Sequence, residues 1–256
     1  MANCTNCGAK LTGKFCSECG QKKFSPHDLT IGKFILNFFE DFFKYDTNIF
    51  KSLSDLLFRP GYLSNEYVKG RIASHVKPLK FFIFTCIVVF FIGKMFAQND
   101  YSFALEDLDF MKASIEKVTA EKGISKDIFI EKFNSNYFSK ISFYYLIAIV
   151  VFTLVLSIVF YRQKRKMAEH LVFSLHFYTA CLIFSLVDSF TDNILPFSYY
   201  VMFFVVPFIY LFFAVKHFYI KKFLPDFSFT ILLYVVYFVI TYYWIIITSQ
   251  ITITFF

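Results

Sequence analysis

The sequence predicts an all-α polytopic membrane protein of about five transmembrane helices, preceded by a small cysteine-rich N-terminal unit. Hydrophobic residues make up 57% of the 256 residues, against about 45–50% in soluble domains. This excess lies in continuous runs of about 20 residues, the length at which a helix crosses a bilayer. Two Cys-x-x-Cys motifs precede the first run and define the separate N-terminal unit.

Residues 1–24 form the predicted metal-binding unit. Cys4 and Cys7 make the first motif, and Cys16 and Cys19 make the second after a gap of eight residues. Each motif curls so that both thiolates point at one centre, and four thiolates suit a tetrahedral Zn²⁺ ion. A closed four-sulfur site leaves no position for a substrate, so the motifs predict a structural zinc ribbon. An iron–sulfur centre and a pair of disulfides are the alternatives.

The ribbon is predicted to behave as a tethered module. Gly8 and Gly20 permit the tight turn that follows each motif. A unit of this size has almost no hydrophobic core, so the metal must supply most of its folding free energy. The linker Gln21–His27 is polar and contains Pro26. We therefore expect little packing between the ribbon and the membrane domain.

Residues 25–78 are predicted to form cytoplasmic or interfacial helices. From Asp28 to Lys44 the apolar residues follow the i, i+3, i+4, i+7 pattern of an amphipathic helix. This helix is too short to span and is expected flat on the inner leaflet or against the bundle. A second helix is expected near 48–58, ended by Pro60-Gly61. A third is expected from Ser64 to about His75.

Residues 79–256 are predicted to form the helical membrane domain. Between its first two apolar runs, the segment 98–140 carries two amphipathic patterns, near Leu105–Val118 and Ile124–Phe133, which indicate a small helical cap on the outer face. The predicted spans cover residues 79–97, 141–161, 171–190, 197–215 and 227–248.

The loop Arg162–His170 sets the predicted orientation. Four of its first five residues are Lys or Arg, and short loops rich in these residues stay in the cytoplasm. Alternation then places the N-terminus in the cytoplasm and the C-terminus outside. It also places the segment 98–140, which has eight acidic residues, on the outer side.

Four polar residues near the cytoplasmic face are further candidates for chemistry: Glu169, His170, His176 and His217. Glu169 and His176 share a helix face but are about 10 Å apart along its axis, too far to bind one metal together. His176 lies inside a span, where ionisable groups are costly and often functional. The alternative is a helix-terminal acid and a histidine bonded to a neighbouring helix. All five histidines fall on the cytoplasmic side, so a second metal site or a proton-handling site there is a further hypothesis.

Three functions are compatible with these features. The leading hypothesis is a non-enzymatic membrane scaffold or sensor, whose ribbon and inner helices contact the lipid bilayer or a cytoplasmic protein partner; nucleic acid is not indicated. The second is a small transporter or channel with His176, Asp188 and Pro207 in its pathway. The third is an intramembrane metalloenzyme using Glu169, His170 and His217. No Gly-rich phosphate loop, Gly-x-Ser-x-Gly motif or glycosidase-type carboxylate pair is present in the sequence.

Three motifs in a fixed order resemble one family. They are the paired cysteines followed by Gly20-Gln21; Pro60-Gly61 with Tyr67, Gly70, Arg71 and Pro78, next to the first span; and the run Ala168-Glu169-His170 through Phe173 to His176. Together they resemble the bacterial membrane family called domain of unknown function 3667. The chain departs from the family pattern at Ile72 and His75. The resemblance implies the bacterial cytoplasmic (inner) membrane, and no known activity, substrate or partner.

Overall fold

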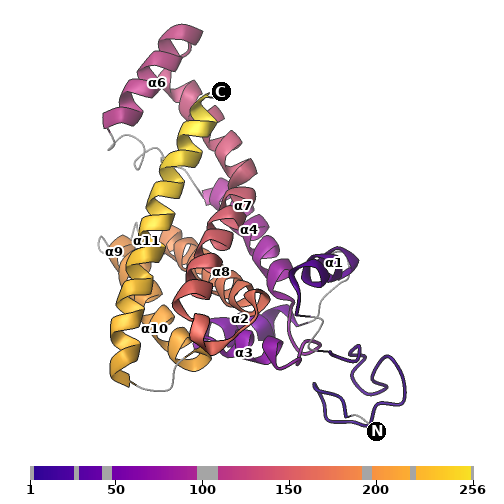
Figure 1. The fold of residues 1–256 in the computed structure, drawn as a ribbon. Helices are drawn as coiled ribbons and strands as arrows, with labels where there is room; N and C mark the ends of the chain where they lie inside the picture. The colour runs from indigo at the N-terminus through magenta and orange to yellow at the C-terminus, as the bar shows by residue number, and fades with distance from the viewer. Residues whose placement is uncertain are drawn as a thin grey trace.

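The computed structural model describes residues 3–25, 29–41, 48–96, 109–191, 198–219 and 223–254, and its regular elements there are all helical (Figure 1). The helices are α1 (Ile31–Asp41), α2 (Ile49–Phe58), α3 (Tyr62–Val68), α4 (Pro78–Phe96), α6 (Asp109–Lys122), α7 (Lys126–Val159), α8 (Met167–Thr191), α9 (Ser198–Tyr200), α10 (Val206–Phe218) and α11 (Phe223–Thr254). A 3₁₀ turn covers Tyr161–Gln163 and a π-helical turn covers Val201–Val205.

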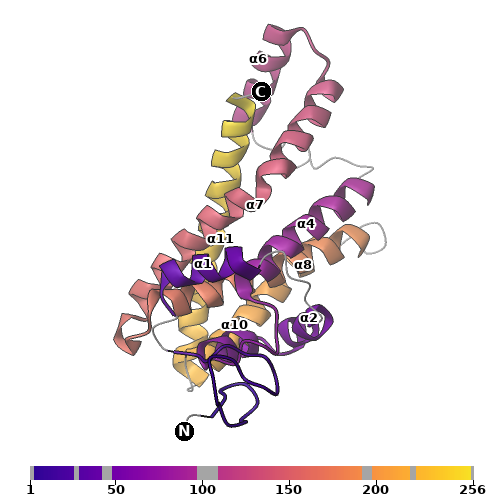
Figure 2. The same ribbon diagram turned by 90° about the vertical axis from the view of Figure 1, so that its right-hand side faces the viewer.

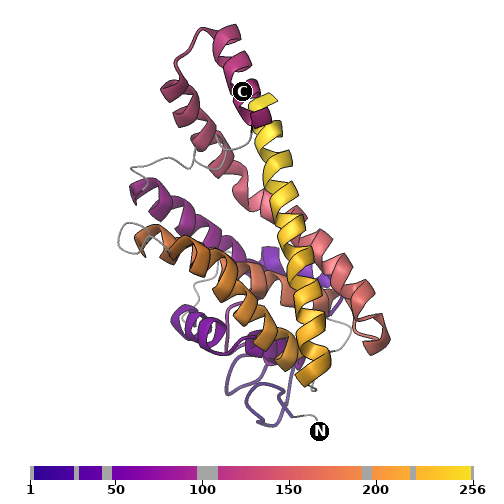
Figure 3. The same ribbon diagram turned by 90° about the vertical axis from the view of Figure 1, so that its left-hand side faces the viewer.

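Pairs of neighbouring helices build the bundle. α4 lies beside α8, as Figure 3 shows, and α7 lies beside α11, which also packs against α10. The long helices α7 and α11 extend together to the end of the molecule where α6 and the C-terminus lie (Figure 1). At the opposite end, α2 and α3 pack against α8, and the N-terminal ribbon lies nearby (Figure 2). The bundle therefore has two dissimilar ends.

Aromatic side chains dominate the core of the bundle. Phe152 of α7, Phe177 and Tyr178 of α8 and Tyr237 of α11 meet with ring centroids 4.9 to 6.2 Å apart. Because lipid gives no hydrophobic drive between helices, such close packing is what holds membrane helices together. The same core extends through Leu56 to the inner helices.

The described residues of the predicted spans are helical, except that α7 ends at Val159, two residues before the end of the predicted span 141–161. By length and composition, Met167–Asp188, Val201–Phe218 and Phe227–Thr254 can each cross a membrane. Pro78–Ile92 and Phe143–Val159 are shorter apolar helices among the described residues. These findings indicate a membrane protein, and the number of five spans stays a prediction.

The segment 98–140 differs from its prediction. The second helix expected there is not separate, because α7 starts at Lys126 and continues without a break into the second predicted span. Ser125 caps it by accepting a hydrogen bond from the N–H of Ile128. No Gly or Pro interrupts α7, so nothing in its sequence ends the helix. α6 covers part of the first expected helix, whose Leu105 and Leu108 lie outside the described residues.

The structure has the three helices predicted within residues 25–78, but the third differs in both boundaries and begins at Tyr62 rather than Ser64. α1 and α2 form where amphipathic helices were expected, although Asp28 and the stretch 42–47 lie outside the described residues. The third helix ends at Val68 rather than near His75. Gly70 causes this early end, because its φ of +82° is the left-handed conformation that terminates helices.

Candidate metal centre and its docking site

The two cysteine motifs adopt the same backbone fold. In the first, the N–H of Cys4 donates to the carbonyl of Ala9, and the N–H of Gly8 donates back to the carbonyl of Cys4. In the second, Cys16, Gly20 and Gln21 repeat this pattern, with all four bonds between 2.8 and 2.9 Å. Gly8 and Gly20 have φ values of +80° and +70°, as the predicted tight turns require.

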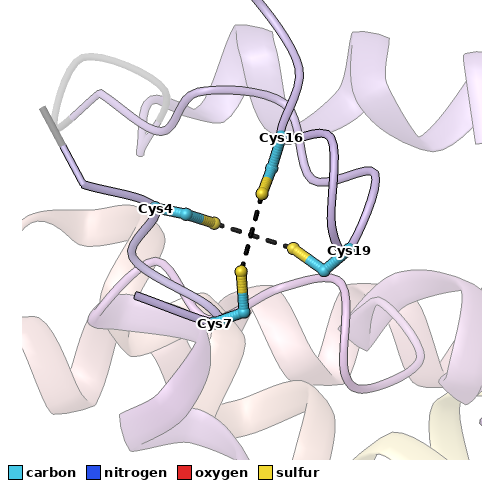
Figure 4. Close-up of side chains that lie close together, drawn as sticks. All are labelled: Cys4, Cys7, Cys16 and Cys19. Carbon is cyan, nitrogen blue, oxygen red and sulfur yellow. Dashed lines mark hydrogen bonds between the residues drawn. The ribbon is translucent and has the colours of Figure 1, made fainter. Parts of the chain in front are cut away.

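This backbone brings four sulfur atoms together (Figure 4). Sγ of Cys4 lies 3.6 Å from that of Cys19, and Sγ of Cys7 lies 3.5 Å from that of Cys16. All four lie within 4.8 Å of one another. Four thiolates at about 2.3 Å from a tetrahedral ion would be about 3.8 Å apart. The cluster therefore can hold a metal ion, and among the described residues no other group of three or more His, Cys, Asp or Glu side chains can.

The close sulfur atoms oppose simultaneous ionisation of the thiols. Backbone N–H groups, first that of Cys7, lower the pKa of Cys4 to about 7. For Cys7, the N–H of Ala9 lowers the pKa, but the sulfurs of Cys19 and Cys16, with burial and Cys4, raise it to about 12. A bound cation removes this conflict by stabilising every thiolate, so metal binding and folding of the ribbon are coupled.

Gln21 links the ribbon to the chain that leads into the membrane domain. Its backbone belongs to the second motif, but its side chain, 6% exposed, points out of it. Nε2 donates to the carbonyl of Gly70 at 2.7 Å and to the hydroxyl of Thr5 at 2.8 Å. Oε1 accepts from the N–H groups of Ile72 and Ala73, both at 2.9 Å. The amide thus uses both donors and both lone pairs, so each hydrogen-bonding position of this buried group has a partner.

The partner of Gln21 is the turn that ends α3, and we call residues 69–76 the juxtamembrane corner. The N–H of Gly70 bonds the carbonyl of Tyr67, and the N–H of Arg71 bonds that of Glu66, which is the Schellman arrangement. Arg71 also pairs its side chain with Glu66 at 2.9 Å. A Cβ on Gly70 would lie 2.4 Å from the ring of Phe24, so only glycine fits against the ribbon here.

Two further hydrogen bonds join ribbon and corner. The hydroxyl of Thr5 donates to the carbonyl of Gly70 at 2.8 Å, and the hydroxyl of Ser74 donates to Oδ1 of Asn6, also at 2.8 Å. The prediction of little packing between the ribbon and the membrane domain did not foresee this contact with the corner, which lies outside residues 79–256. It considered apolar residues only, whereas this contact is made by polar side chains and backbone groups.

The other side of the corner is fixed to α2. Nδ2 of Asn48 donates to the carbonyl of Ala73 at 3.1 Å, and the hydroxyl of Ser52 accepts from the N–H of Val76 at 2.9 Å. Pro78 then begins α4, a position that suits its missing N–H. The predicted motif is thereby accounted for: Gly70 and Arg71 shape the corner, Pro78 starts the helix, and Tyr67 packs edge-on against Phe34 of α1.

Glu169 and His170 fasten the basic loop to the end of α10. Arg165 pairs with Glu169 at 3.0 Å, donates to the carbonyl of Phe218 at 2.7 Å and lies over the Phe218 ring. Nδ1 of His170 lies 2.7 Å from the hydroxyl of Tyr219. Both residues thus have structural partners.

His176 and His217 lie at other contacts. Nδ1 of His176 is 2.9 Å from the hydroxyl of Ser64 on α3. The carbonyl of His217 accepts from Asn65, and its ring lies edge-on to Tyr62 with centroids 6.5 Å apart. The four predicted polar residues are thus distributed over separate contacts of α8 and α10.

Asp188 and Pro207 also have structural partners. Asp188 of α8 accepts a hydrogen bond from the hydroxyl of Ser198 of α9. Pro207 has no N–H for the carbonyl of Phe203, and Tyr234 of α11 donates its hydroxyl to the carbonyls of Phe204 at 2.8 Å and Phe203 at 3.4 Å. The π-helical turn ends two residues before this proline, at Val205.

Sequence reasoning missed the docking role of Gln21 and the polar partners of the histidines. Gln21 was noticed only as part of a motif, and its partners Gly70, Ile72 and Ala73 contribute backbone atoms, which carry no side-chain pattern. The one hint in the sequence was that Gly20-Gln21 and the motif containing Gly70 both belong to the same family resemblance.

Comparison with known families supports that resemblance. Residues 46–90 match the family described as "Protein of unknown function (DUF3667)", the family suggested by the motifs. The matched segment includes α2, α3, the juxtamembrane corner and the start of α4. Neither a curated protein nor a solved structure matches the chain.

Proposed function

We propose that this chain, which matches the DUF3667 family at its juxtamembrane corner, is a non-enzymatic scaffold or sensor of the bacterial inner membrane. In it, a cytoplasmic zinc ribbon is docked on the base of a membrane helix. The contact of Gln21 with Gly70, Ile72 and Ala73 carries the proposal. The corner leads within a few residues to Pro78, the first residue of α4. Loss of the metal, or binding of a protein partner to the ribbon, therefore alters the contacts that hold the corner and the start of α4 in place.

Zinc is the proposed metal because of its ligands. A closed set of four thiolates is typical of structural zinc and offers no open position for catalysis. The sulfur distances of 3.5 and 3.6 Å are close to those of a tetrahedral ion. In the cytoplasm, where thiols stay reduced, a metal is also favoured over disulfides.

The other polar side chains form hydrogen bonds or ion pairs within the fold, which favours a non-enzymatic role. Glu169 and His170 hold the basic loop to α10, and Asp188 bonds Ser198 of α9. The transporter alternative through His176, Asp188 and Pro207 gains no support from these contacts: His176 lies beside Ser64, Asp188 bonds Ser198, and Tyr234 bonds the carbonyls near Pro207.

Trypsin digestion of oriented vesicles tests both the docking and the orientation. Lys69 and Arg71 flank Gly70 and are natural trypsin sites in the corner. In inside-out vesicles holding the full chain, we expect both to resist cleavage with zinc and to be cut after zinc is chelated. The exposed loop Arg162–Lys166 should be cut in either case and serves as an internal control.

Two outcomes would overturn the proposal. Cleavage of the corner in sealed right-side-out vesicles would contradict the cytoplasmic placement of the ribbon. Equal resistance of Lys69 and Arg71 with and without zinc would show that the ribbon does not support the corner. Loss of bound metal in His170→Ala or His217→Ala, with the cysteines intact, would instead favour the metalloenzyme.

A further inference from the structure

Helix α2 turns one face towards the bundle and the other away from it. Ser52 and Leu56 are buried on the first face, and Leu56 belongs to the main core. Phe50 and Phe58 lie on the other face and are 83% and 81% exposed, more than any other large hydrophobic side chain among the described residues. Because exposed Ser54 lies midway between them, the two rings share one side of the helix.

A cation directly follows each of these phenylalanines along the chain. Lys51 and Arg59 are both exposed. Asp55, the one acidic residue of α2, is 13% exposed and pairs with Arg59 and with His75 of the corner. The exposed side of the helix therefore combines aromatic rings with positive charge. We call its four residues the outer face of α2: Phe50, Lys51, Phe58 and Arg59.

Two contacts relate α2 and α3 to the predicted spans. The carbonyl of Leu56 accepts from the hydroxyl of Tyr210 on α10, and the hydroxyl of Ser64 on α3 lies 2.9 Å from Nδ1 of His176 on α8. Tyr210 and His176 each lie five residues inside the inner end of a predicted span. At 1.5 Å per residue, these contacts are about 7.5 Å along the helices from their inner ends. The pair α2 and α3 therefore lies alongside the predicted spans and not beyond their ends.

We propose that the outer face of α2 binds the anionic surface of the lipid bilayer, with Phe50 and Phe58 at the boundary between headgroups and acyl chains. Amphipathic helices lie with their apolar face about 5–10 Å into this boundary, which agrees with the level of the contacts to α8 and α10. From there the long side chains of Lys51 and Arg59 reach the lipid phosphates. Exposure of both rings to water would instead forgo the free energy of burying them.

This lipid contact goes beyond the docking of the ribbon. It requires α8 and α10 to cross the membrane, but it requires neither zinc nor Gln21. Because Asn48 and Ser52 of the α2 segment bond the juxtamembrane corner, lipid bound to α2 holds the corner from its other side. Trypsin digestion tests the ribbon and lipid quenching tests α2, so either proposal can fail while the other stands.

Quenching of tryptophan fluorescence by brominated lipid tests the position of the two rings. Trp244, the one native tryptophan, is replaced by phenylalanine, and Phe50→Trp or Phe58→Trp is added to the full chain. In vesicles of phosphatidylcholine and phosphatidylglycerol with brominated acyl chains, both reporters should lose most of their emission. Phe15→Trp is the matched control, since Phe15 is 61% exposed on the ribbon and should keep its emission. Equal quenching at positions 15 and 58 would overturn the proposal.

A comparison of two brominated lipids tests the recognition of charge. With Phe58→Trp as the reporter, brominated phosphatidylglycerol should quench more strongly than brominated phosphatidylcholine at the same mole fraction. Lys51→Gln should reduce this preference by up to about fivefold, the effect of one cation near the surface. Lys10→Gln, at an exposed lysine of the ribbon, should leave it unchanged. Lys51 is chosen because a change at Arg59 also removes the ion pair with Asp55. Equal quenching by the two lipids before any lysine is changed would overturn the recognition of anionic lipid.

Discussion

At the scale of single residues, the contact between ribbon and corner depends on the amide of Gln21. The side chain is buried, and both its ends are used: Nε2 donates to the carbonyl of Gly70, and Oε1 accepts from two backbone N–H groups. Gln21 is therefore a better probe of docking than the cysteines, whose replacement also destroys the metal centre.

Gln21→Glu should loosen the docking without loss of the metal. The carboxylate oxygen that replaces Nε2 cannot donate and would face the carbonyl of Gly70, so we expect a loss of about 1–3 kcal/mol in the free energy of unfolding. The backbone carbonyl of residue 21 still accepts from Cys16, so zinc content should not change. Unfolding in detergent and metal analysis measure both, with Glu18→Gln on the exposed surface of the ribbon as the control for charge. A Gln21→Glu protein as stable as the wild type would show that the contact contributes little.

Gly70→Ala should destabilise the protein more than the same change at Gly123. Both glycines have positive φ, +82° and +60°, so alanine meets backbone strain of about 1–2 kcal/mol at either. Only at Gly70 would the new Cβ also collide with a side chain, the ring of Phe24. The difference between the two variants in thermal unfolding measures the ribbon contact. Adding Phe24→Ala to Gly70→Ala should recover part of the loss; equal losses at both glycines would contradict the close docking.

At the scale of elements, helix ends and interruptions are explained by local residues. Gly70 ends α3 in a Schellman arrangement, Ser125 caps α7, and Pro78 starts α4. Pro207 lacks an N–H in the continuous helical run of α9, the π-helical turn and α10, and Tyr234 bonds the carbonyls of Phe203 and Phe204 in that run.

A double-mutant cycle tests the pairing of Pro207 with Tyr234. Tyr234→Phe removes the hydroxyl and should cost about 1 kcal/mol of unfolding free energy, because its hydrogen bonds to the carbonyls of Phe204 and Phe203 are lost. Pro207→Ala supplies an N–H that can bond the carbonyl of Phe203. In this background Tyr234→Phe should cost clearly less. If the cost is the same in both backgrounds, the tyrosine does not compensate for the proline.

At the scale of the whole molecule, the sequence predicted the helices better than the contacts between distant segments. Four cysteine ligands within sixteen residues and apolar runs of span length are local signals, and the structure has helices and a sulfur cluster there. The docking of Gln21 joins residues about 50 positions apart through backbone atoms, and no local pattern encodes it. For the same reason the partners of His75 and His176 were missed: Asp55 and Ser64 lie on other helices.

The central claim for the whole molecule is that the metal-held ribbon supports the juxtamembrane corner through Gln21. The N–H groups of Ile72 and Ala73 report this directly, since each donates to Oε1 of Gln21. Amide hydrogen exchange of the full chain in detergent, with zinc bound and after chelation, is the measurement. We expect both amides to exchange much faster once the metal is removed, while amides in the middle of α8 keep their protection. Unchanged protection of Ile72 and Ala73 in the metal-free protein would contradict the claim.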